Sequence, residues 1–548
     1  MKNTFDFHFH LLFKHFISVQ KNGQKLPLDK DFKTKGVMAA LDELMGNAFD
    51  SQSSPSMVKK SSLKCGVTAL LAMEYAFAEN ISGMIRGFSN DNLPIDWGFI
   101  DRVKDRKTTY FDLFKTEISY YKNSEKMLDE KFNIRFLTRK QSPKMRMDNP
   151  AKTYLAFSVE GAHNFSEAKI RTANAFTDPS AAYRKIQDDP ANIDLFSVNL
   201  THLSEIPEQP MGGFAQGLTS TAQMAFRSKD FTPKTGFGLT EKARTFIKTL
   251  YTHPFPTLID IKHMSVYTRY KFYQFREDLI EQNPKIANLP VISSHTGFTF
   301  CSLEEFLEGK QYKNEVTFID GQKITSIQAK NRKVGKTNFL LNNKLCSNPW
   351  TINLFDEEIV EIMRSGGMIG ISMDQRVLGA SKTMMDGIRG EYFKDSEAIP
   401  LLEWEKWFKE GKLDVEKYEE PLRRTDREIR HILLFCHQIA YAVKLGYKNL
   451  NWTGKSSPWD HLCIGSDFDG LINPINGYED VTKISNLRND LFRFLPLAEK
   501  NMELFPEVKV FRRNPDGNID EKHLSECISK FLLENGQKLL ERFLENWK

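Results

Sequence analysis

Two histidines near the start of the chain have the spacing of metal ligands. His8 and His10 lie two residues apart in the apolar run Phe5-Asp6-Phe7-His8-Phe9-His10. Because successive side chains of a strand point to opposite faces, both imidazoles would project from the same face. Imidazole nitrogen is a common zinc ligand, so the pair would supply half of a metal site.

Imidazole or carboxylate side chains also end several later apolar runs. These further candidates are Glu160, His202, His263, His295 and Asp467. Taken singly, each has a structural explanation, because buried histidines often bond to backbone groups and acidic residues favour turns or the first turn of a helix. Their repeated position at the ends of apolar runs favours a shared site.

The elements that must position these residues alternate between strands and helices. Strands are predicted at 36–41, 154–160, 195–200, 256–261, 289–293, 367–373 and 462–465, in addition to the opening run, and helices include 61–79, 240–250 and 424–445. With about eight such strands, the pattern predicts an α/β fold, a (β/α)8 TIM-type barrel whose polar residues gather at the C-terminal ends of the strands.

Two long segments interrupt the alternation. The chain is predicted to form one metal-dependent hydrolase barrel domain, 1–548, with insertions at about 309–348 and 377–419. They follow the predicted sixth and seventh strands, so both should lie on the catalytic face of the barrel. Their aromatic content, including Trp404 and Trp407, favours a packed lid that narrows the pocket.

Composition describes an ordinary folded protein. The residues are 40% hydrophobic and 27% charged, and the net charge of +5 comes from 76 basic and 71 acidic residues, which gives no case for a nucleic-acid partner. No apolar run is long enough for a membrane span. Six scattered cysteines without a CxxC pair, and an N-terminus without an apolar signal stretch, favour a reducing compartment, so a cytoplasmic location is expected.

The combined residues suit hydrolysis assisted by two divalent metal ions. A carboxylate can bridge two ions, and such a site lowers the pKa of a bound water and polarises a carbonyl oxygen. Asp467 would take a proton from the water and pass it to a leaving amine. His202 would donate a hydrogen bond to the developing oxyanion.

At this point the sequence resembles the membrane (renal) dipeptidase family of zinc metallopeptidases, in the amidohydrolase superfamily of barrels. The matching stretches are Ser158-Val159-Glu160-Gly161-Ala162-His163, Leu200-Thr201-His202, Asp260-Ile261-Lys262-His263, Ser294-His295-Thr296, Gly366-Gly367-Met368-Ile369 and Ile464-Gly465-Ser466-Asp467-Phe468-Asp469-Gly470. The first and last of these are the most specific.

The resemblance implies a role for each candidate. Two metal ions, expected to be Zn²⁺, would be held by His8, His10, Glu160, His263 and His295, with Glu160 as the bridge. His202 would contact the substrate carbonyl and Asp467 would be the acid/base. Asp469, the second acid of its motif, would be structural.

Two positions depart from the family pattern. The family begins His-x-Asp, whereas this chain has His10 at the second position, which removes a negative charge. The family also carries an Arg-Asn pair whose Arg holds the substrate's terminal carboxylate, and the matching position here is Ile352-Asn353. Arg332 or Lys333 of the first insertion are candidate replacements for that cation.

The leading interpretation is a binuclear zinc hydrolase that cleaves an amide bond in a dipeptide or similar small molecule. A second enzymatic interpretation keeps the metals and changes the substrate to an N-acyl amino acid, a cyclic amide or an ester. A third is a catalytically silent barrel used as a binding module, since function must be argued from the site and not from the fold. A homodimer stays open as the assembly.

Overall fold

Eight parallel strands form the centre of the molecule and close into a barrel. The computed structural model describes residues 3–20, 23–36, 38–39, 42, 48–84, 86, 93–140, 146–168, 178–207, 209–218, 228–236, 238–336, 344–380, 396–413 and 426–547. The barrel strands are β1 (Thr4–Phe9), β2 (Leu63–Leu70), β4 (Thr153–Val159), β5 (Leu195–Asn199), β6 (Leu258–Asp260), β7 (Ile292–Thr296), β12 (Met368–Ser372) and β14 (Leu462–Gly465). Their order is β2-β1-β14-β12-β7-β6-β5-β4, and β2 pairs again with β4 to complete the circle. The predicted TIM-type barrel is confirmed.

The strands are buried on both faces. Every residue of the eight barrel strands is buried, as expected for a parallel sheet packed inside and covered by helices outside. Gly370 and Gly465 permit one close approach, since a Cβ at either position would lie 1.9 Å from the backbone oxygen of Ser294. A further strand, β3 (Ile134–Phe136), extends the sheet beside β4.

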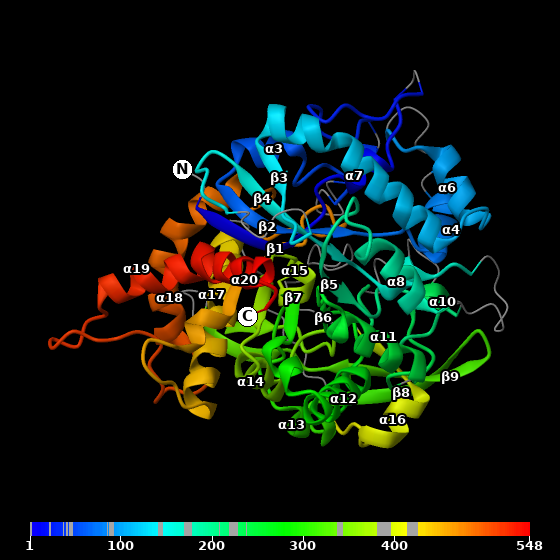
Figure 1. The fold of residues 1–548 in the computed structure, drawn as a ribbon. Coiled ribbons are helices and arrows are strands. Elements are labelled where there is room, and N and C mark those ends of the chain that lie inside the picture. Colours follow the sequence, from blue (N-terminus) through cyan, green and yellow to red (C-terminus); the bar gives the residue numbers. More distant parts are fainter. Residues whose placement is uncertain are drawn as a thin grey trace.

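Helices surround the barrel (Figure 1). The longer ones are α4 (Tyr75–Met84), α6 (Trp97–Lys104), α7 (Tyr110–Phe132), α8 (Pro179–Gln187), α11 (Glu241–Thr252), α12 (Val266–Gln282), α14 (Asp356–Arg364), α17 (Asp426–Asn449), α18 (Leu487–Asn501), α19 (Glu521–Ser529) and α20 (Asn535–Leu544). Short helices are α1 (Phe13–Phe16), α3 (Pro55–Lys60), α10 (Ser228–Phe231), α13 (Leu303–Leu307), α15 (Gln375–Leu378) and α16 (Leu401–Trp407). Side-chain caps define several starts, because Thr109, Thr240 and Ser265 each accept a hydrogen bond from a backbone N–H of the first turn.

Two predicted elements near the N-terminus are wrong. The segment 61–79, predicted as one helix, contains strand β2 followed by the start of α4. The predicted strand 36–41 lies partly outside the described residues, and residues 36, 38 and 39 are helical. The barrel still has eight strands, since β2 takes the place of the strand predicted at 36–41.

The two insertions meet in a small antiparallel sheet outside the barrel. The first holds β8 (Tyr312–Ile319), β9 (Gln322–Ala329), β10 (Arg332–Lys336) and β11 (Lys344–Ser347), and the second holds β13 (Glu397–Pro400). β9 pairs with β8 on one side and with β13 on the other, while β10 pairs with β11. Figure 1 shows β8, β9 and α16 together at the lower right. Both insertions leave the C-terminal ends of their barrel strands, β7 and β12.

Aromatic side chains hold this outer sheet together. Phe306, Tyr312 and Phe408 are buried in one cluster with Trp404 and Trp407 packed against it. The rings of Trp404 and Phe408 are stacked at 5.3 Å. The described part of the insertions therefore has a packed core of its own.

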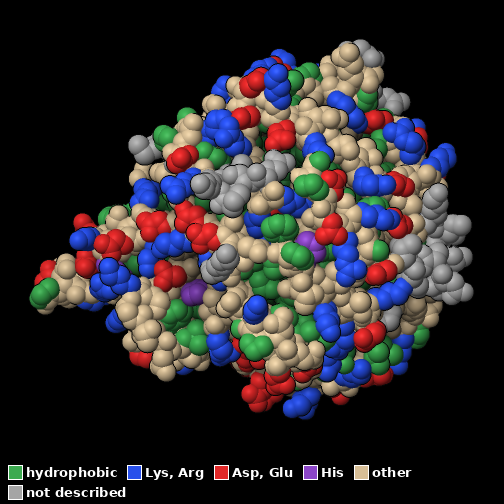
Figure 2. Space-filling model, in the orientation of Figure 1, with side chains coloured by type: hydrophobic (Ala, Val, Ile, Leu, Met, Phe, Trp, Pro, Cys, Tyr) green, Lys and Arg blue, Asp and Glu red, His purple; other side chains and the backbone are tan. Residues whose placement is uncertain are grey.

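Charges of both signs cover the surface. On the face drawn in Figure 2, basic and acidic side chains are interspersed, in keeping with their near-equal numbers. Among the described residues, no helix is both long and apolar enough to cross a membrane.

Candidate metal centre

The predicted site residues converge at the C-terminal end of the barrel. His8 lies in β1 and His10 directly follows it, while Glu160 directly follows β4. The remaining candidates lie in or shortly after β5, β6, β7 and β14, and they are His202, His263, His295 and Asp467. Because parallel strands end on one face, residues separated by more than 450 positions become neighbours.

Glu160 lies at the centre of the group. Five imidazoles bring an Nε2 atom close to its carboxylate oxygens: His263 at 3.1 Å, His10 at 3.3 Å, His8 and His202 at 3.5 Å, and His295 at 3.8 Å. Glu160 is only 3% exposed, so this concentration of nitrogen donors around one carboxylate is shielded from bulk water.

The donor set fits metal ions. Three groups of side chains bring one ligand atom each within 4.8 Å of one another: His8, Glu160 and His295; His8, His10 and Asp467; and Glu160, His202 and His263. Two ligands of one tetrahedral zinc ion lie about 3.3 Å apart, given Zn–N bonds of about 2.0–2.1 Å. In addition, Nε2 of His8 and both ring nitrogens of His10 are buried without a hydrogen-bond partner among the described residues. Buried polar atoms without partners are rare, and a bound cation would satisfy the Nε2 atoms of His8 and His10.

Burial keeps most of these imidazoles neutral. It lowers the pKa of His10 and His295, and lowers the pKa of His263 to about 3. For Glu160, burial raises the pKa, but the charges of His202 and His8 outweigh it and hold the pKa well below its usual range. At His8, burial also lowers the pKa, but the charge of Glu160 outweighs it and raises the pKa. Neutral imidazoles such as His10, His263 and His295 and an ionised carboxylate are the protonation states that a metal ion requires.

Ser294 orients two of the ligand candidates. Its hydroxyl lies 2.8 Å from Nδ1 of His295 and 3.3 Å from Nδ1 of His8. With each Nδ1 held by this hydroxyl, the Nε2 atoms face Glu160. Such support from outside the ligand set fixes the ring orientation of metal-binding histidines.

A buried carboxylate, Glu74, holds His202. Oε1 of Glu74 lies 2.9 Å from Nδ1 of His202 and accepts a hydrogen bond from the backbone N–H of Leu203 at 3.2 Å. Burial raises the pKa of Glu74, but the His202 charge outweighs it and lowers the pKa to about 2, so this carboxylate only accepts hydrogen bonds. Nδ1 of His202 therefore carries a proton, and Nε2 faces Glu160.

The charge of His202 follows from its two carboxylate neighbours. Burial lowers the pKa of His202, but Glu160 and Glu74 outweigh it and raise the pKa to about 9. At neutral pH both ring nitrogens would then carry protons. Glu74 lies in the loop after β2, outside every motif, so no pattern in the sequence pointed to it.

Asp467 lies beside the histidine pair of β1. Its Oδ1 is 3.8 Å from Nε2 of His8 and 3.9 Å from Nε2 of His10, and its side chain is 15% exposed, more than Glu160. Burial raises the pKa of Asp467, and the charge of Glu160 adds to this. The backbone is left-handed at Asp467, with φ +63°, and at His263, with φ +70°. Such strained non-glycine positions concentrate at functional sites.

Asp469 faces away from this group. Its carboxylate accepts hydrogen bonds from the backbone N–H of Gln52 at 2.8 Å and of Ser53 at 3.0 Å, and it pairs with Lys14 at 2.7 Å. These contacts tie the loop after β14 to the segment before α3, which accounts for Asp469 as a structural residue.

The family's arginine position has no cationic side chain here. The amide of Asn353 accepts from the backbone N–H of Gly297 at 3.2 Å and donates to the backbone oxygen of Val377 at 2.8 Å, so it fastens loops. Arg332 lies on β10 and pairs with Glu305 of α13 at 3.0 Å. Its charge is therefore already paired within the insertion.

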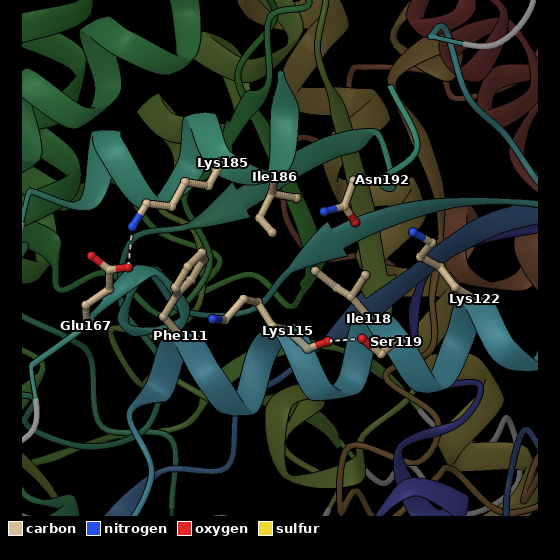
Figure 3. Close-up of a pocket in the computed structure, with 9 residues that line it drawn as sticks. All are labelled: Phe111, Lys115, Ile118, Ser119, Lys122, Glu167, Lys185, Ile186 and Asn192. Atoms are coloured by element: carbon tan, nitrogen blue, oxygen red, sulfur yellow. Dashed lines mark hydrogen bonds and ion pairs between the residues drawn. The ribbon is translucent and has the colours of Figure 1, made fainter. Parts of the chain in front are cut away.

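A separate pocket of about 270 Å³ lies between α7 and α8 (Figure 3). Lys115 and Lys122 come from α7, and Lys185 from α8 pairs with Glu167 at 2.5 Å. These lysines are exposed on the outside of the barrel, so the pocket is not part of the metal centre.

Comparison with known proteins gives one family match. The model of the membrane dipeptidase family, peptidase family M19, matches residues 341–503, the part that contains β12, α17, β14 and Asp467. No curated protein matches the chain.

Several solved structures contain chains similar to this one. A metallopeptidase from Rhodobacter sphaeroides, bound to a phosphinate mimic of the dipeptide L-Ala-D-Ala, is 13% identical with a TM-score of 0.44, and 98% of each chain is covered. A probable dipeptidase, PvdM, from Pseudomonas aeruginosa is 12% identical with a TM-score of 0.45, over 99% of this chain and 96% of that one. An amidohydrolase from the same organism is 12% identical with a TM-score of 0.40, over 89% and 91%.

Proposed function

Because the chain resembles the membrane dipeptidase family and is a metal-dependent hydrolase of that type, we propose that it hydrolyses the amide bond of a dipeptide or a similar small substrate. The observation that carries this proposal is the single buried carboxylate, Glu160, with five imidazoles around it and Asp467 beside them. A binding module has no need for that concentration of ligands next to a partly exposed acid.

The proposed cofactors are two Zn²⁺ ions. They would be held by His8, His10, Glu160, His263 and His295, with Glu160 shared between them. When bound, two such ions would lower the pKa of a water molecule and polarise a carbonyl oxygen. Imidazole and carboxylate ligands are those that zinc takes in catalytic sites.

Asp467 is proposed to move the proton. Its carboxylate is more exposed than Glu160 and has no hydrogen-bond donor among the described residues, so a substrate or water can reach it. Burial and the charge of Glu160 raise the pKa of Asp467, which makes its carboxylate a stronger base than an exposed one and suits a group that accepts a proton from water and then gives it to the leaving amine.

His202 is proposed to donate from Nε2 to the substrate carbonyl oxygen. Since its Nδ1–H is committed to Glu74, donation from Nε2 requires the doubly protonated ring. Bound metal ions would disfavour the positive charge of doubly protonated His202, and the negative charge of Glu74 would offset that effect. A preorganised donor of this kind contributes about 10²–10³ in rate.

Metal analysis and a substrate panel test the proposal. Purified chain should hold about two transition-metal ions, and His10→Ala should hold fewer. His253→Ala is the matched control, because His253 bonds to Asp188 outside the site and its loss should leave the metal content unchanged. Dipeptides should be hydrolysed faster than N-acyl amino acids, cyclic amides and esters. The opposite preference would mean that the substrate is an N-acyl amino acid, a cyclic amide or an ester. Full metal content without any hydrolysis would indicate a binding module.

We also propose a cytoplasmic location. All six cysteines are free thiols, five of them buried, which suits a reducing compartment. Fractionation of cells, with an antibody against the chain, would test this.

A further inference from the structure

One buried lysine at the metal-centre end of the barrel has no hydrogen-bond or ion-pair partner in the described part of the chain. Lys262 is 3% exposed and lies between Asp260, the last residue of β6, and His263. Its ammonium group makes no hydrogen bond or ion pair among the described residues. A buried ammonium without a partner is costly, so it points to an anion that the protein binds.

Three other buried or half-buried cations in the described part of the chain are paired, in contrast to Lys262. Lys14 pairs with Asp469 at 2.7 Å, Arg269 with Glu358 at 2.6 Å, and Arg376 with Asp374 at 2.6 Å. These three charges hold loops at the same end of the barrel together. Lys262 alone of the four keeps its hydrogen-bonding capacity free for a ligand.

Three carboxylates act on the charge of Lys262. The charges that act on it most strongly are those of Asp467, Asp374 and Asp260, and all three carboxylates favour its charged form. Each lies beyond ion-pair distance, and Asp374 is already bound by Arg376 through both carboxylate oxygens. Burial opposes the charged form of Lys262, and these three carboxylates offset that effect without pairing with the ammonium among the described residues.

We propose that Lys262 binds the terminal carboxylate of the substrate. This inference rests on the proposed hydrolase function and names its substrate class: small amides that carry a free carboxylate near the scissile bond. A lysine ammonium recognises a carboxylate through a charge-assisted hydrogen bond, which is stronger than a neutral one. Lys262 directly precedes His263, a proposed metal ligand, so a carboxylate bound to it would lie at the metal-centre end of the barrel.

The test compares pairs of substrates in the Lys262→Met variant. The methionine side chain has a length similar to that of lysine but carries no charge. The substrates are alanyl-alanine, with both configurations of the second residue, and the matching C-terminal amides. The matched control is Lys64→Met, because Lys64 is also buried, lies near the start of β2 at the opposite end of the barrel, and donates to the backbone oxygen of Asn149. Metal content and thermal unfolding are measured for every variant.

The expected result is selective. Lys262→Met should raise KM for the dipeptide roughly 10- to 100-fold, the loss of one hydrogen bond to a charged group, and should leave KM for the amide unchanged. D-alanine, a product that carries the free carboxylate and has no amide bond to cleave, should show the same loss of affinity in titration calorimetry. Lys64→Met should match the wild type on both substrates.

Two outcomes would overturn the inference. Equal losses on the dipeptide and its amide would mean that Lys262 acts on the reacting centre, and unchanged KM on both would mean that it binds no carboxylate. The failure of the proposed function looks different, since wild-type protein with full metal content would then hydrolyse neither substrate.

Discussion

Replacing Asp467 by asparagine separates proton transfer from metal binding. The amide is nearly isosteric with the carboxylate, and no described residue donates a hydrogen bond to the Asp467 side chain, so Asp467→Asn should fold normally. Glu160 and its five imidazoles remain, so the metals should stay. The variant can no longer accept a proton, and general acid–base catalysis contributes about 10²–10⁴-fold, or about 2.7–5.5 kcal/mol of activation free energy.

The assay compares kcat with metal content. We expect kcat for the best substrate to fall by that factor in Asp467→Asn, with KM and bound metal close to the wild type. Glu160→Gln is the contrasting variant, because Nε2 atoms of five histidines lie within 3.8 Å of this carboxylate and its loss should release metal as well as activity. Near-wild-type turnover in Asp467→Asn would refute its role as acid/base, and metal loss in that variant would show that Asp467 is a ligand.

Three further predictions concern the site and the fold. Glu74→Gln keeps the hydrogen bond to His202 but removes its charge, so the alkaline limb of the kcat profile should move to lower pH and activity at pH 8 should fall by up to about 10²-fold; an unshifted limb would contradict this. Burial raises the pKa of Asp356 to about 6, so its contribution to stability is present below about pH 4 and is lost as pH rises through 6. Asp356→Asn, which can still accept from Tyr441, should therefore stabilise the chain against urea more at pH 8 than at pH 5, by at most about 3 kcal/mol, and an equal effect at both values would refute it. Chelation should lower the unfolding temperature, and metal restored at 100 times its Kd should return about 2.7 kcal/mol; no change on chelation would contradict metal binding to the folded site.

The ends of the barrel strands could be predicted because their signal is local. Glu160, His295 and Asp467 each end a run that is buried on both faces, and runs of that kind are typical of parallel strands. The helix predicted at 61–79 is wrong because the local signal there was ambiguous. A short apolar run such as Leu63–Leu70 fits both the helical period of about 3.6 residues and the two-residue period of a strand. Only its pairing with β1 and β4 selects the strand.

Residues that act from loops could not be predicted. Glu74 and Lys262 are charged side chains that are 3% exposed, whereas single-sequence reasoning places such residues in solvent. Glu74 acts through His202, which is 128 positions away, and Lys262 stands out because its ammonium lacks a hydrogen-bond partner among the described residues. The pairing of β13 with β9 is likewise invisible in the sequence, because it joins two separate insertions.

Because β9 pairs with β13, the two insertions depend on each other when the chain folds and when the region is altered. During synthesis, β9 emerges long before β13, and the whole of β12 lies between them, so the outer sheet is completed only after the seventh barrel strand exists. An edge of β9 stays open until then. A change in either insertion that disturbs residues 324–327 or Glu397–Pro400 would also affect the other insertion. A transplant of this outer sheet to another barrel would have to carry both segments together.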